Sequence, residues 1–307
     1  MGRLAKDVIG TAGIVTGMAQ TASGRYFAGK RCFLTGAASG IGRATALRLA
    51  AQGAELYLTD RDYDGLEQTV SDVRALGAEV PAHRVLDVSD YDEVAAFAAD
   101  IHAAHPSMDV VMNIAGVSAW GTVDRLTHDQ WSRMVSINLM GPIHVIETFL
   151  PPMVEAGRGG HLVNVSSAAG LVALPWHAAY SASKYGLRGL SEVLRFELAR
   201  HRIGVSVVVP GAVKTPLVKT VEIAGVDRED PSVSRWVDRF SGHAVSPEKA
   251  AAKILAGVAK NRYLIYTSED IRALYAFKRL AWRPYSVAMR QANVLFTRAL
   301  RPSPAPH

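Results

Sequence analysis

The sequence contains one cysteine, Cys32, among its 307 residues, so an intrachain disulfide is excluded. Cys32 lies in the apolar run Cys32-Phe33-Leu34, which is typical of a buried strand, and nothing in this cysteine usage indicates secretion. Extensive disorder is not indicated either, because hydrophobic residues make up 49% of the chain and charged residues 20%. A chain of this length fits one large α/β domain with extensions.

Acidic residues are missing from residues 271–307, although this segment contains seven lysines and arginines. Because the whole chain has a formal net charge of +6 and this segment +7, the remaining 270 residues have a net charge of −1. A main body so close to neutral lacks the basic surface that is typical of nucleic-acid binding. We therefore expect no nucleic-acid partner.

Long hydrophobic runs are also missing from the N-terminal segment. The weakly apolar stretch at residues 8–19 is diluted by three glycines and two threonines, and Asp7 precedes it. No clear small-x-small cleavage site follows, and the stretch is far shorter than the roughly 20 apolar residues of a spanning helix. We interpret residues 1–28 as an N-terminal arm and expect a cytoplasmic protein.

Between residues 30 and 266, short β-branched apolar runs alternate with longer Ala-rich amphipathic segments. The predicted strands are 31–35, 55–59, 83–86, 110–113, 161–165, 205–209 and 263–266. The predicted helices include 41–52, 91–104, 130–156 and 179–200. This alternation predicts an α/β fold with a doubly wound, Rossmann-type parallel sheet, which binds ligands at the carboxyl ends of its strands. Residues 215–245 break the pattern, and we interpret them either as a lid over a substrate or as a surface loop.

A glycine-rich turn, Thr35-Gly36-Ala37-Ala38-Ser39-Gly40-Ile41-Gly42, follows the first predicted strand and leads into a helix. Glycines allow the backbone to approach a pyrophosphate, whose charge the free N–H groups of the helix N-terminus can bind. Asp60 ends the second strand eighteen residues after Gly42, where a carboxylate can accept hydrogen bonds from an adenosine ribose. This context predicts dinucleotide binding.

Tyr180 and Lys184 lie four residues apart in a predicted helix, so their side chains leave the same face. A fixed cation lowers the pKa of a nearby phenol, and the pair could therefore transfer protons at neutral pH. Two alternatives are a solvated helix face and an S-x-x-K nucleophile motif formed by Ser181 and Lys184. The S-D-N and K-T-G motifs that accompany S-x-x-K in penicillin-binding proteins are absent from the chain.

Together these motifs resemble the single-domain branch of the short-chain dehydrogenase/reductase family, whose glycine loop has the form TGxxxGxG. The other family marks occur in family order, and they are Asp87, Asn113-Ile114-Ala115-Gly116, Asn138, Ser167, Tyr180, Lys184, Pro210-Gly211 and Thr215. The resemblance covers residues 30–268. Ile114 replaces the commoner second asparagine of its motif, and Ser167 is preferred to Ser166 because the family serine lies thirteen residues before the tyrosine.

The resemblance implies a catalytic role for four residues. Tyr180 would be the general acid/base, and Ser167 would bind the substrate oxygen. Lys184 would lower the pKa of Tyr180 and hold the nicotinamide ribose, while Asn138 would support a proton-relay water. The implied cofactor-binding residues are Gly36, Ser39, Gly40, Ile41, Gly42, Asp60, Arg61, Asp87, Val88, Asn113, Ala115, Gly116, Tyr180, Lys184, Pro210, Gly211, Val213 and Thr215. The resemblance also implies a homodimer or homotetramer that packs through the helices at 130–156 and 179–200.

An apolar wall is predicted on the substrate side, because the segment between Ser167 and Tyr180 includes Leu171, Val172, Leu174, Pro175 and Trp176. We therefore expect a hydrophobic alcohol or ketone as substrate, which would contact Ser167, Trp176 and Tyr180.

The cofactor is expected to be NAD, because Asp60 would repel the 2′-phosphate of NADP. The neighbouring Arg61 leaves NADP open. A second hypothesis is an NAD-binding redox sensor without turnover, and a third is a serine acyl hydrolase that uses Ser181 and Lys184.

Three histidines outside these motifs are given no functional role. His102 and His105 share a helical face without a further ligand at metal spacing, so no metal site is predicted. His177 lies one turn before Tyr180 and is interpreted as packing at a helix end.

Residues 269–307 extend beyond the family resemblance as a basic amphipathic segment, which Pro284 would divide in two. Its basic residues are Arg272, Lys278, Arg279, Arg283, Arg290, Arg298 and Arg301. One interpretation is a peripheral helix on an anionic membrane. The alternative is a clamp that packs on a neighbouring subunit or covers the active site.

Overall fold

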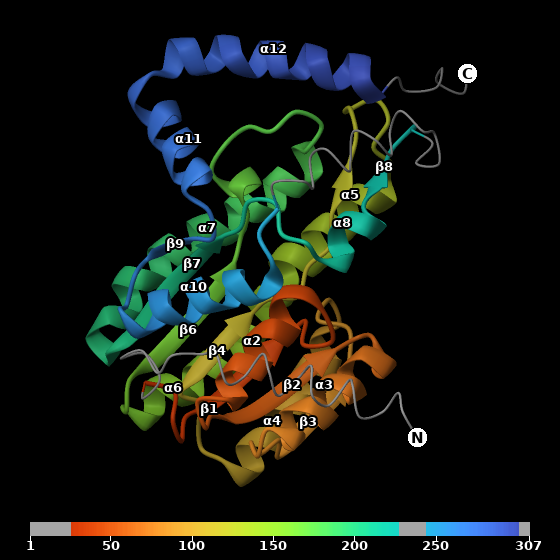
Figure 1. Ribbon diagram of the computed structural model, residues 1–307. Coiled ribbons are helices and arrows are strands. Elements are labelled where there is room, and N and C mark those ends of the chain that lie inside the picture. The colour runs from red at the N-terminus through yellow and green to blue at the C-terminus, as the bar shows by residue number, and fades with distance from the viewer. Residues whose placement is uncertain (1–25, 227–243, 301–307) are drawn as a thin grey trace, which may run out of the picture.

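The computed structural model describes residues 26–226 and 244–300, and it confirms the predicted doubly wound sheet. Seven parallel strands lie in the order β3-β2-β1-β4-β6-β7-β9 (Figure 1). They are β1 (Arg31–Thr35), β2 (Glu55–Asp60), β3 (Ala82–Val85), β4 (Val110–Asn113), β6 (Gly160–Val165), β7 (Ile203–Val209) and β9 (Leu264–Tyr266). Each predicted strand agrees with the observed one to within two residues. The order reverses between β1 and β4, where this class of fold binds ligands.

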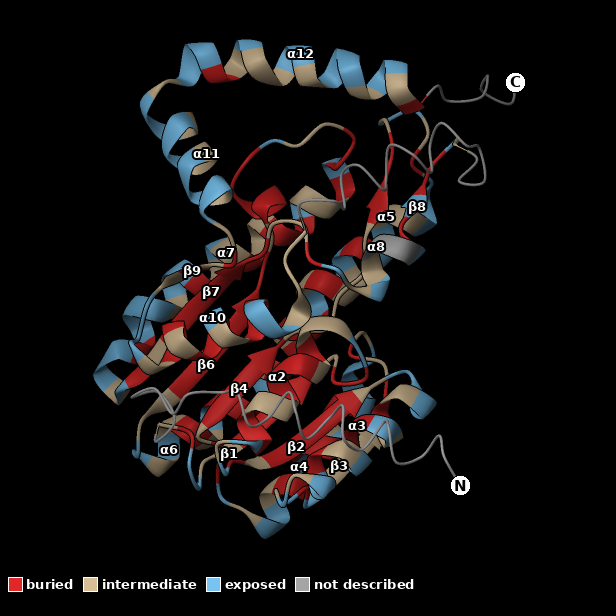
Figure 2. Cartoon of the chain, in the orientation of Figure 1, coloured by how far each residue is buried: buried red, intermediate tan, exposed pale blue. Residues whose placement is uncertain are grey.

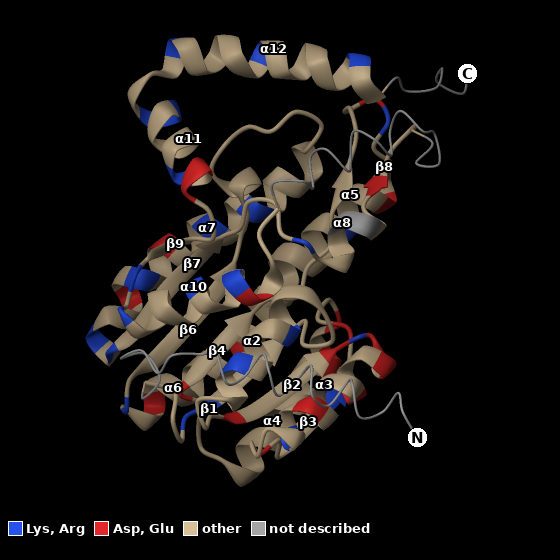
Figure 3. Ribbon diagram, in the orientation of Figure 1, with Lys and Arg blue, Asp and Glu red and all other residues tan. Residues whose placement is uncertain are grey.

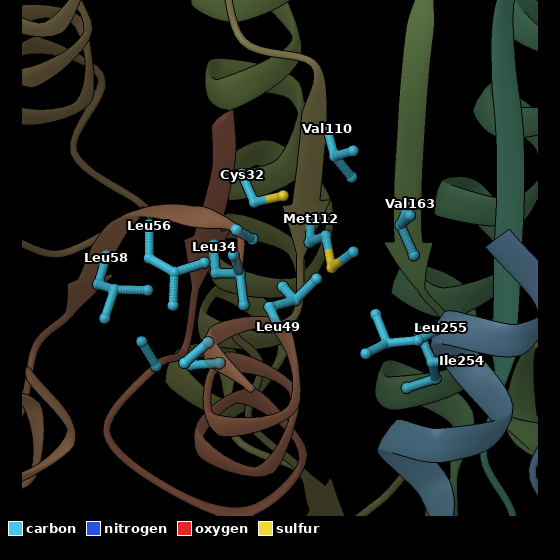
Figure 4. Close-up of a cluster of buried hydrophobic side chains, with 14 of the residues drawn as sticks. Cys32, Leu34, Leu49, Leu56, Leu58, Val110, Met112, Val163, Ile254 and Leu255 are labelled. Carbon is cyan, nitrogen blue, oxygen red and sulfur yellow. The ribbon is translucent and has the colours of Figure 1, made fainter. Parts of the chain in front are cut away.

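Helices cover both faces of the sheet. One layer contains α2 (Gly40–Ala50), α3 (Tyr63–Ala75) and α10 (Pro247–Ala259), and the other contains α4 (Tyr91–Ala104), α6 (Gly141–Ala156) and α7 (Ala178–Glu197). Alternate residues of one strand face the two layers. Cys32 and Leu34 pack toward α2 and α10 (Figure 4), whereas Phe33 stacks on Phe149 of α6 with ring centroids 4.1 Å apart. Burial on both faces explains why these strands are continuous apolar runs.

The packed body begins slightly before the predicted boundary at residue 29. Phe27 is fully buried in the cluster that also contains Cys32 and Leu34, and Tyr26 contacts it edge to face. The expected N-terminal arm otherwise falls on residues 1–25, which lie outside the described residues.

The long helix predicted at residues 130–156 is interrupted by a wider turn. Helix α5 (His128–Val135) begins at Thr127 with a capping box to Gln130, and a π-helical turn at Ser136–Met140 then leads into α6. A single regular helix was therefore the wrong prediction. The extra residue of a π-turn changes which side chains face inward, and Asn138 lies in this turn.

The segment at 215–245 is more regular than we expected from the sequence. It begins with α8 (Pro216–Thr220), and β8 (Glu222–Ile223) then pairs in parallel with β5 (Ala119–Trp120) to form a second, two-stranded sheet. The part of the predicted lid at 227–243 lies outside the described residues.

Two helices form the C-terminal extension, α11 (Glu269–Leu280) and α12 (Trp282–Leu300). The division falls at Ala281, and Pro284 lies in the first turn of α12, where its missing N–H breaks no intrahelical hydrogen bond. Figure 1 shows α12 lying across the carboxyl-end side of the molecule, above the loops that follow the strands. The basic residue Arg301 lies outside the described residues.

Candidate active site

A cavity of about 960 Å³ opens at the carboxyl ends of the strands. It brings together most of the residues that the sequence predicted for cofactor and substrate. The predicted residues in its lining are Gly36, Ser39, Gly40, Ile41, Gly42, Asp60, Arg61, Asp87, Val88, Ala115, Gly116, Ser167, Tyr180, Lys184, Pro210, Gly211, Val213 and Thr215. Asn113, Asn138 and Trp176 are outside the lining and lie behind its wall.

The glycine loop forms a backbone cradle between β1 and α2. Gly36 adopts φ +71°, and a Cβ atom on Gly42 would lie 1.8 Å from the carbonyl oxygen of Gly36, so only glycine fits at residue 42. Ser39 is the N-cap of α2 but makes no capping hydrogen bond with its side chain. The close backbone and the N-terminus of α2 therefore suit the pyrophosphate of a dinucleotide.

Asp60 connects the end of β2 to the glycine loop. Its Oδ2 accepts a hydrogen bond from Ala38 N at 2.9 Å, and its Oδ1 accepts one from Asp62 N at 3.1 Å. The carboxylate is thus held at the cavity wall, where it still has lone pairs to accept further hydrogen bonds. Arg61 is exposed beside it.

The loops that follow β1 and β4 are joined by a side chain of β1. The Thr35 hydroxyl oxygen accepts from the N–H groups of Ile114 and Ala115, at 3.0 and 3.1 Å. Asn113 is buried below this loop, where its Nδ2 donates to Asn164 Oδ1 at 2.9 Å. Asn113 therefore supports the loop after β4 from below and does not itself line the cavity.

Asn138 holds the loop after β4 from the π-turn. Its Oδ1 accepts from Val117 N and its Nδ2 donates to Val117 O, both at 2.9 Å. The same Nδ2 lies 3.3 Å from the hydroxyl of Ser183 in α7. A Cβ atom on Gly116 would lie 2.9 Å from Asn138 Oδ1 and 3.3 Å from Lys184 Nζ, so the absence of a side chain at Gly116 leaves these groups close together.

Ser167, Tyr180 and Lys184 all line the cavity. The side chains of Ser167 and Tyr180 form a hydrogen bond, and Ser167 Oγ also accepts from Ala169 N at 3.1 Å. Lys184 is buried and its Nζ donates to Val165 O at 3.0 Å, at a distance of 5.7 Å from the Tyr180 ring centroid. Ser166 instead donates to Lys184 O, which agrees with its predicted structural role.

The pKa of Tyr180 shifts in the direction opposite to the one that we expected. Burial raises the pKa of Tyr180, and the hydrogen bond from Ser167 opposes this rise. Burial also lowers the pKa of Lys184 to about 8. Because burial disfavours the charged form of both groups, the environment keeps the phenol protonated and weakens the cation that was expected to stabilise phenolate.

Two neighbouring residues bear on the alternative interpretations. His177 Nδ1 lies 2.5 Å from Pro175 O, its ring lies 4.6 Å from that of Trp120, and burial lowers its pKa to about 4. These contacts agree with packing at the start of α7. Ser181 is missing from the lining of the cavity, whereas Lys184, the other residue of the S-x-x-K motif, is part of it.

The sequence prediction missed several apolar residues of the substrate side. They come from two segments that are distant in sequence, and they are Leu217, Val221, Ile271 and Leu274. Trp176, the predicted substrate contact, instead packs with Trp120, Val221, Ile223 and Leu300 of α12. The extension thus contributes residues of α11 to the lining of the cavity.

The described residues contain no group of three or more His, Cys, Asp or Glu side chains arranged to hold a metal ion. Among the described helices, none is both long and apolar enough to cross a membrane.

Together, the parallel sheet, the glycine cradle and the Ser-Tyr-Lys group define a nucleotide-binding oxidoreductase site. The model of the short chain dehydrogenase family matches residues 30–224, and the chain belongs to this family. A putative oxidoreductase, SadH of Mycobacterium tuberculosis, is 37% identical over 261 residues, which cover 84% of this chain and 93% of SadH.

Two solved structures show the same likeness. A short chain dehydrogenase/reductase from Burkholderia phymatum in complex with NAD has a TM-score of 0.75 and 28% identity, and the match covers 92% of this chain and 98% of that one. A metagenomic short-chain oxidoreductase in complex with NADP has a TM-score of 0.63 and 32% identity, and the match covers 79% of this chain and 99% of that one. The relatives support a nicotinamide cofactor for this chain.

Proposed function

We propose that this protein is a nicotinamide-dependent dehydrogenase/reductase that interconverts a hydrophobic secondary alcohol and its ketone. One observation is central to the proposal. The hydrogen-bonded side chains of Ser167 and Tyr180 lie in one cavity, between the glycine cradle and an apolar wall formed by Leu174, Leu217 and Leu274. The two hydroxyl groups could thus bind the oxygen of a substrate that lies between the nucleotide and the apolar wall.

The proposed reaction assigns one task to each polar side chain. When bound, the cofactor supplies hydride to a ketone or accepts it from an alcohol. In the reducing direction, Tyr180 donates its phenolic proton to the carbonyl oxygen, and Ser167 donates a hydrogen bond to that oxygen as its negative charge develops. The raised pKa of Tyr180 keeps the donor protonated at neutral pH.

Lys184 and Asn138 are proposed to support the proton donor. The buried ammonium of Lys184 can donate to ribose hydroxyls and favours phenolate after the proton has left. Asn138 fixes the backbone of Val117 beside Lys184, and a water bound there could return a proton to the tyrosine.

Asp60 supports a preference for NAD. Its carboxylate is fixed at the end of β2 by two backbone N–H groups, so it cannot easily turn away from a 2′-phosphate. Of Ser39 and Arg61, the two other residues considered for binding a 2′-phosphate, only Arg61 is positively charged. Comparing kcat/KM with the two cofactors tests this preference, which a higher value with NADP would contradict.

A homodimer or homotetramer remains our proposal for the assembly. Helix α7 exposes two large apolar side chains, Val193 and Phe196, at 55% and 73%. These side chains support packing of α7 on a second copy, as the family resemblance implied.

The test of the proposed function is the substitution Tyr180→Phe. Phenylalanine keeps the ring but has no transferable proton, so turnover of an apolar ketone should fall by about 1,000-fold. NAD affinity, measured by fluorescence titration, should change less than about threefold, because the cofactor cradle is intact. Substantial turnover by the variant would contradict the mechanism. Binding of NAD without turnover of any apolar alcohol or ketone by the unmodified protein would favour the redox-sensor hypothesis.

A further inference from the structure

The outer face of α12 has an ordered row of side chains that play no part in the fold. Arg283, Val287, Arg290, Val294 and Arg298 follow one another at intervals of four, three, four and four residues. Such spacing places all five on one side of an α-helix, over a length of about 22 Å. All five are exposed, and Val287 and Val294 are 53% and 47% accessible. We call this row the outer stripe.

The opposite face of α12 accounts for the packing of the helix. Tyr285 is buried with Leu171 and Val172, and Leu300 is buried with Trp120 and Trp176. Figure 2 shows α12 with short red, buried segments, while the rest of the helix is intermediate or exposed. The helix is therefore already anchored at both ends, and its stability does not explain the outer stripe.

The charge of the stripe is uncompensated. Residues 271–300 contain six lysines and arginines and no acidic residue, and Figure 3 shows blue without red along α12. Among the described residues, none forms an ion pair with Arg283, Arg290 or Arg298, whereas arginines of the body such as Arg43 and Arg133 pair with carboxylates. The complementary partner of the stripe is thus an anionic surface.

Exposed apolar side chains lie just before the stripe and beside it. Leu280 and Trp282, where α11 meets α12, are 87% and 62% exposed, and Leu295 is 64% exposed. A convex helix that alternates arginines with short apolar side chains, and has tryptophan and leucine at its margins, suits shallow insertion between anionic headgroups. A folded protein partner would instead require a concave or flat complementary patch.

We propose that the outer stripe of α12 binds the protein peripherally to anionic membranes. The helix lies flat, with its three arginines among lipid phosphates and its valines at the level of the glycerol groups. Ile271 and Leu274 of the neighbouring α11 line the cavity, so the bound protein would hold its apolar substrate site near the bilayer. This last consequence rests on the proposed function, but membrane binding itself does not.

Co-sedimentation of the full chain with vesicles tests the proposal. We expect binding to vesicles that contain phosphatidylglycerol and no binding to phosphatidylcholine alone. Binding at about 0.05 M salt should weaken strongly at about 0.5 M, where charges are screened within a few ångströms. The triple variant Arg283→Glu, Arg290→Glu, Arg298→Glu should lower the partition coefficient about 100-fold, since each basic residue contributes about 1 kcal/mol at an anionic surface.

A control variant with the same change in net charge carries Arg200→Glu, Lys260→Glu and Arg262→Glu. These residues are exposed and precede β7 and β9, at the opposite end of the strands from α12. The control variant should bind vesicles nearly as well as the unmodified protein. Val287→Gln with Val294→Gln should weaken binding at both salt concentrations, because it removes the apolar contribution and leaves the charge.

Three outcomes would overturn the proposal. They are absence of binding to anionic vesicles at low salt, equal loss of binding in the stripe and control variants, and dissociation of an oligomer by the stripe variant without a change in vesicle binding. The last outcome would identify the stripe as an interface between copies of this chain. All variants are compared by thermal unfolding, and turnover with a water-soluble substrate checks that the active site is intact.

Discussion

At the scale of single residues, two buried histidines should make the protein sensitive to mild acid. His161 and His177 are both buried, and burial lowers the pKa of each to about 4. Between pH 6.5 and 4 the unfolded chain therefore binds more protons than the folded protein, so the free energy of unfolding falls as the pH falls. Each histidine should contribute a loss of up to about 3 kcal/mol over this range.

Urea unfolding at several pH values between 7 and 4.5 measures this dependence. His161→Gln should reduce its slope, because glutamine can still donate to Ser206, whose hydroxyl lies 2.8 Å from His161 Nε2, and does not titrate. His128→Gln on the exposed start of α5 is the control and should leave the slope unchanged. A slope that is the same in both variants would refute the role of His161.

The sequence predicted best which residues line the cavity. The residue types of the glycine loop, Ser167, Tyr180 and Lys184 are recognisable because their chemistry fixes their spacing along the chain. The pKa of Tyr180 was not predictable in this way, since it depends on burial, and Tyr180 packs against a cluster that includes Leu126, Met134 and Ala224, which are distant in sequence. Trp176 was misplaced for the same reason, because its partner Leu300 lies more than a hundred residues away.

At the scale of elements, the π-turn at Ser136–Met140 should couple stability to activity through Asn138. Asn138→Ala would leave the part-buried N–H and C=O of Val117 without their Asn138 partners, and this loss should lower the free energy of unfolding by about 2 kcal/mol. Asn138→Asp keeps the acceptor for Val117 N but places a buried carboxylate oxygen against Val117 O, so its effect should be at least as large. Chemical denaturation of both variants checks this order.

A purely structural role for Asn138 can be separated from a role beside Lys184. If Asn138 positions the loop next to the amine, the pH profile of kcat should shift in Asn138→Asp, where a carboxylate near Lys184 favours the charged amine. An unchanged pH profile with reduced stability would limit Asn138 to holding the loop.

Elements differed in how well the sequence predicted them. Strands such as β1 and β6 are buried on both faces, so their composition alone marks them. The π-turn depends instead on the tertiary contact of Asn138 with Val117, and β5 and β8 contain two residues each and form by pairing across a hundred residues. Neither leaves a local pattern of period 2 or 3.6 in the sequence.

At the scale of the whole molecule, two hydrogen-bonded anchors join the extension to the loop that follows Ser167. Lys278 Nζ donates to Leu171 O and to the Tyr185 hydroxyl, both at 2.7 Å, and the Tyr285 hydroxyl accepts from Ala173 N at 2.8 Å. Both anchors end on the loop that follows Ser167. The C-terminal helices therefore hold the loop between Ser167 and Leu174 of the apolar wall.

Loss of the Lys278 anchor should loosen this loop without affecting the nucleotide side. In Lys278→Met, amide hydrogen exchange at residues 171–176 should accelerate, and KM for an apolar ketone should rise about tenfold, as the loss of two hydrogen bonds would predict. KM for NAD should stay within about twofold, since the glycine loop lies on the far side of the cavity.

Arg272→Met is the matched control, because Arg272 is exposed and its ion pair with Glu269 contributes little. If exchange at 171–176 were the same in both variants, the extension would cover the cavity without controlling the loop. If KM for NAD rose together with KM for the ketone, the substitution would have disturbed the whole site.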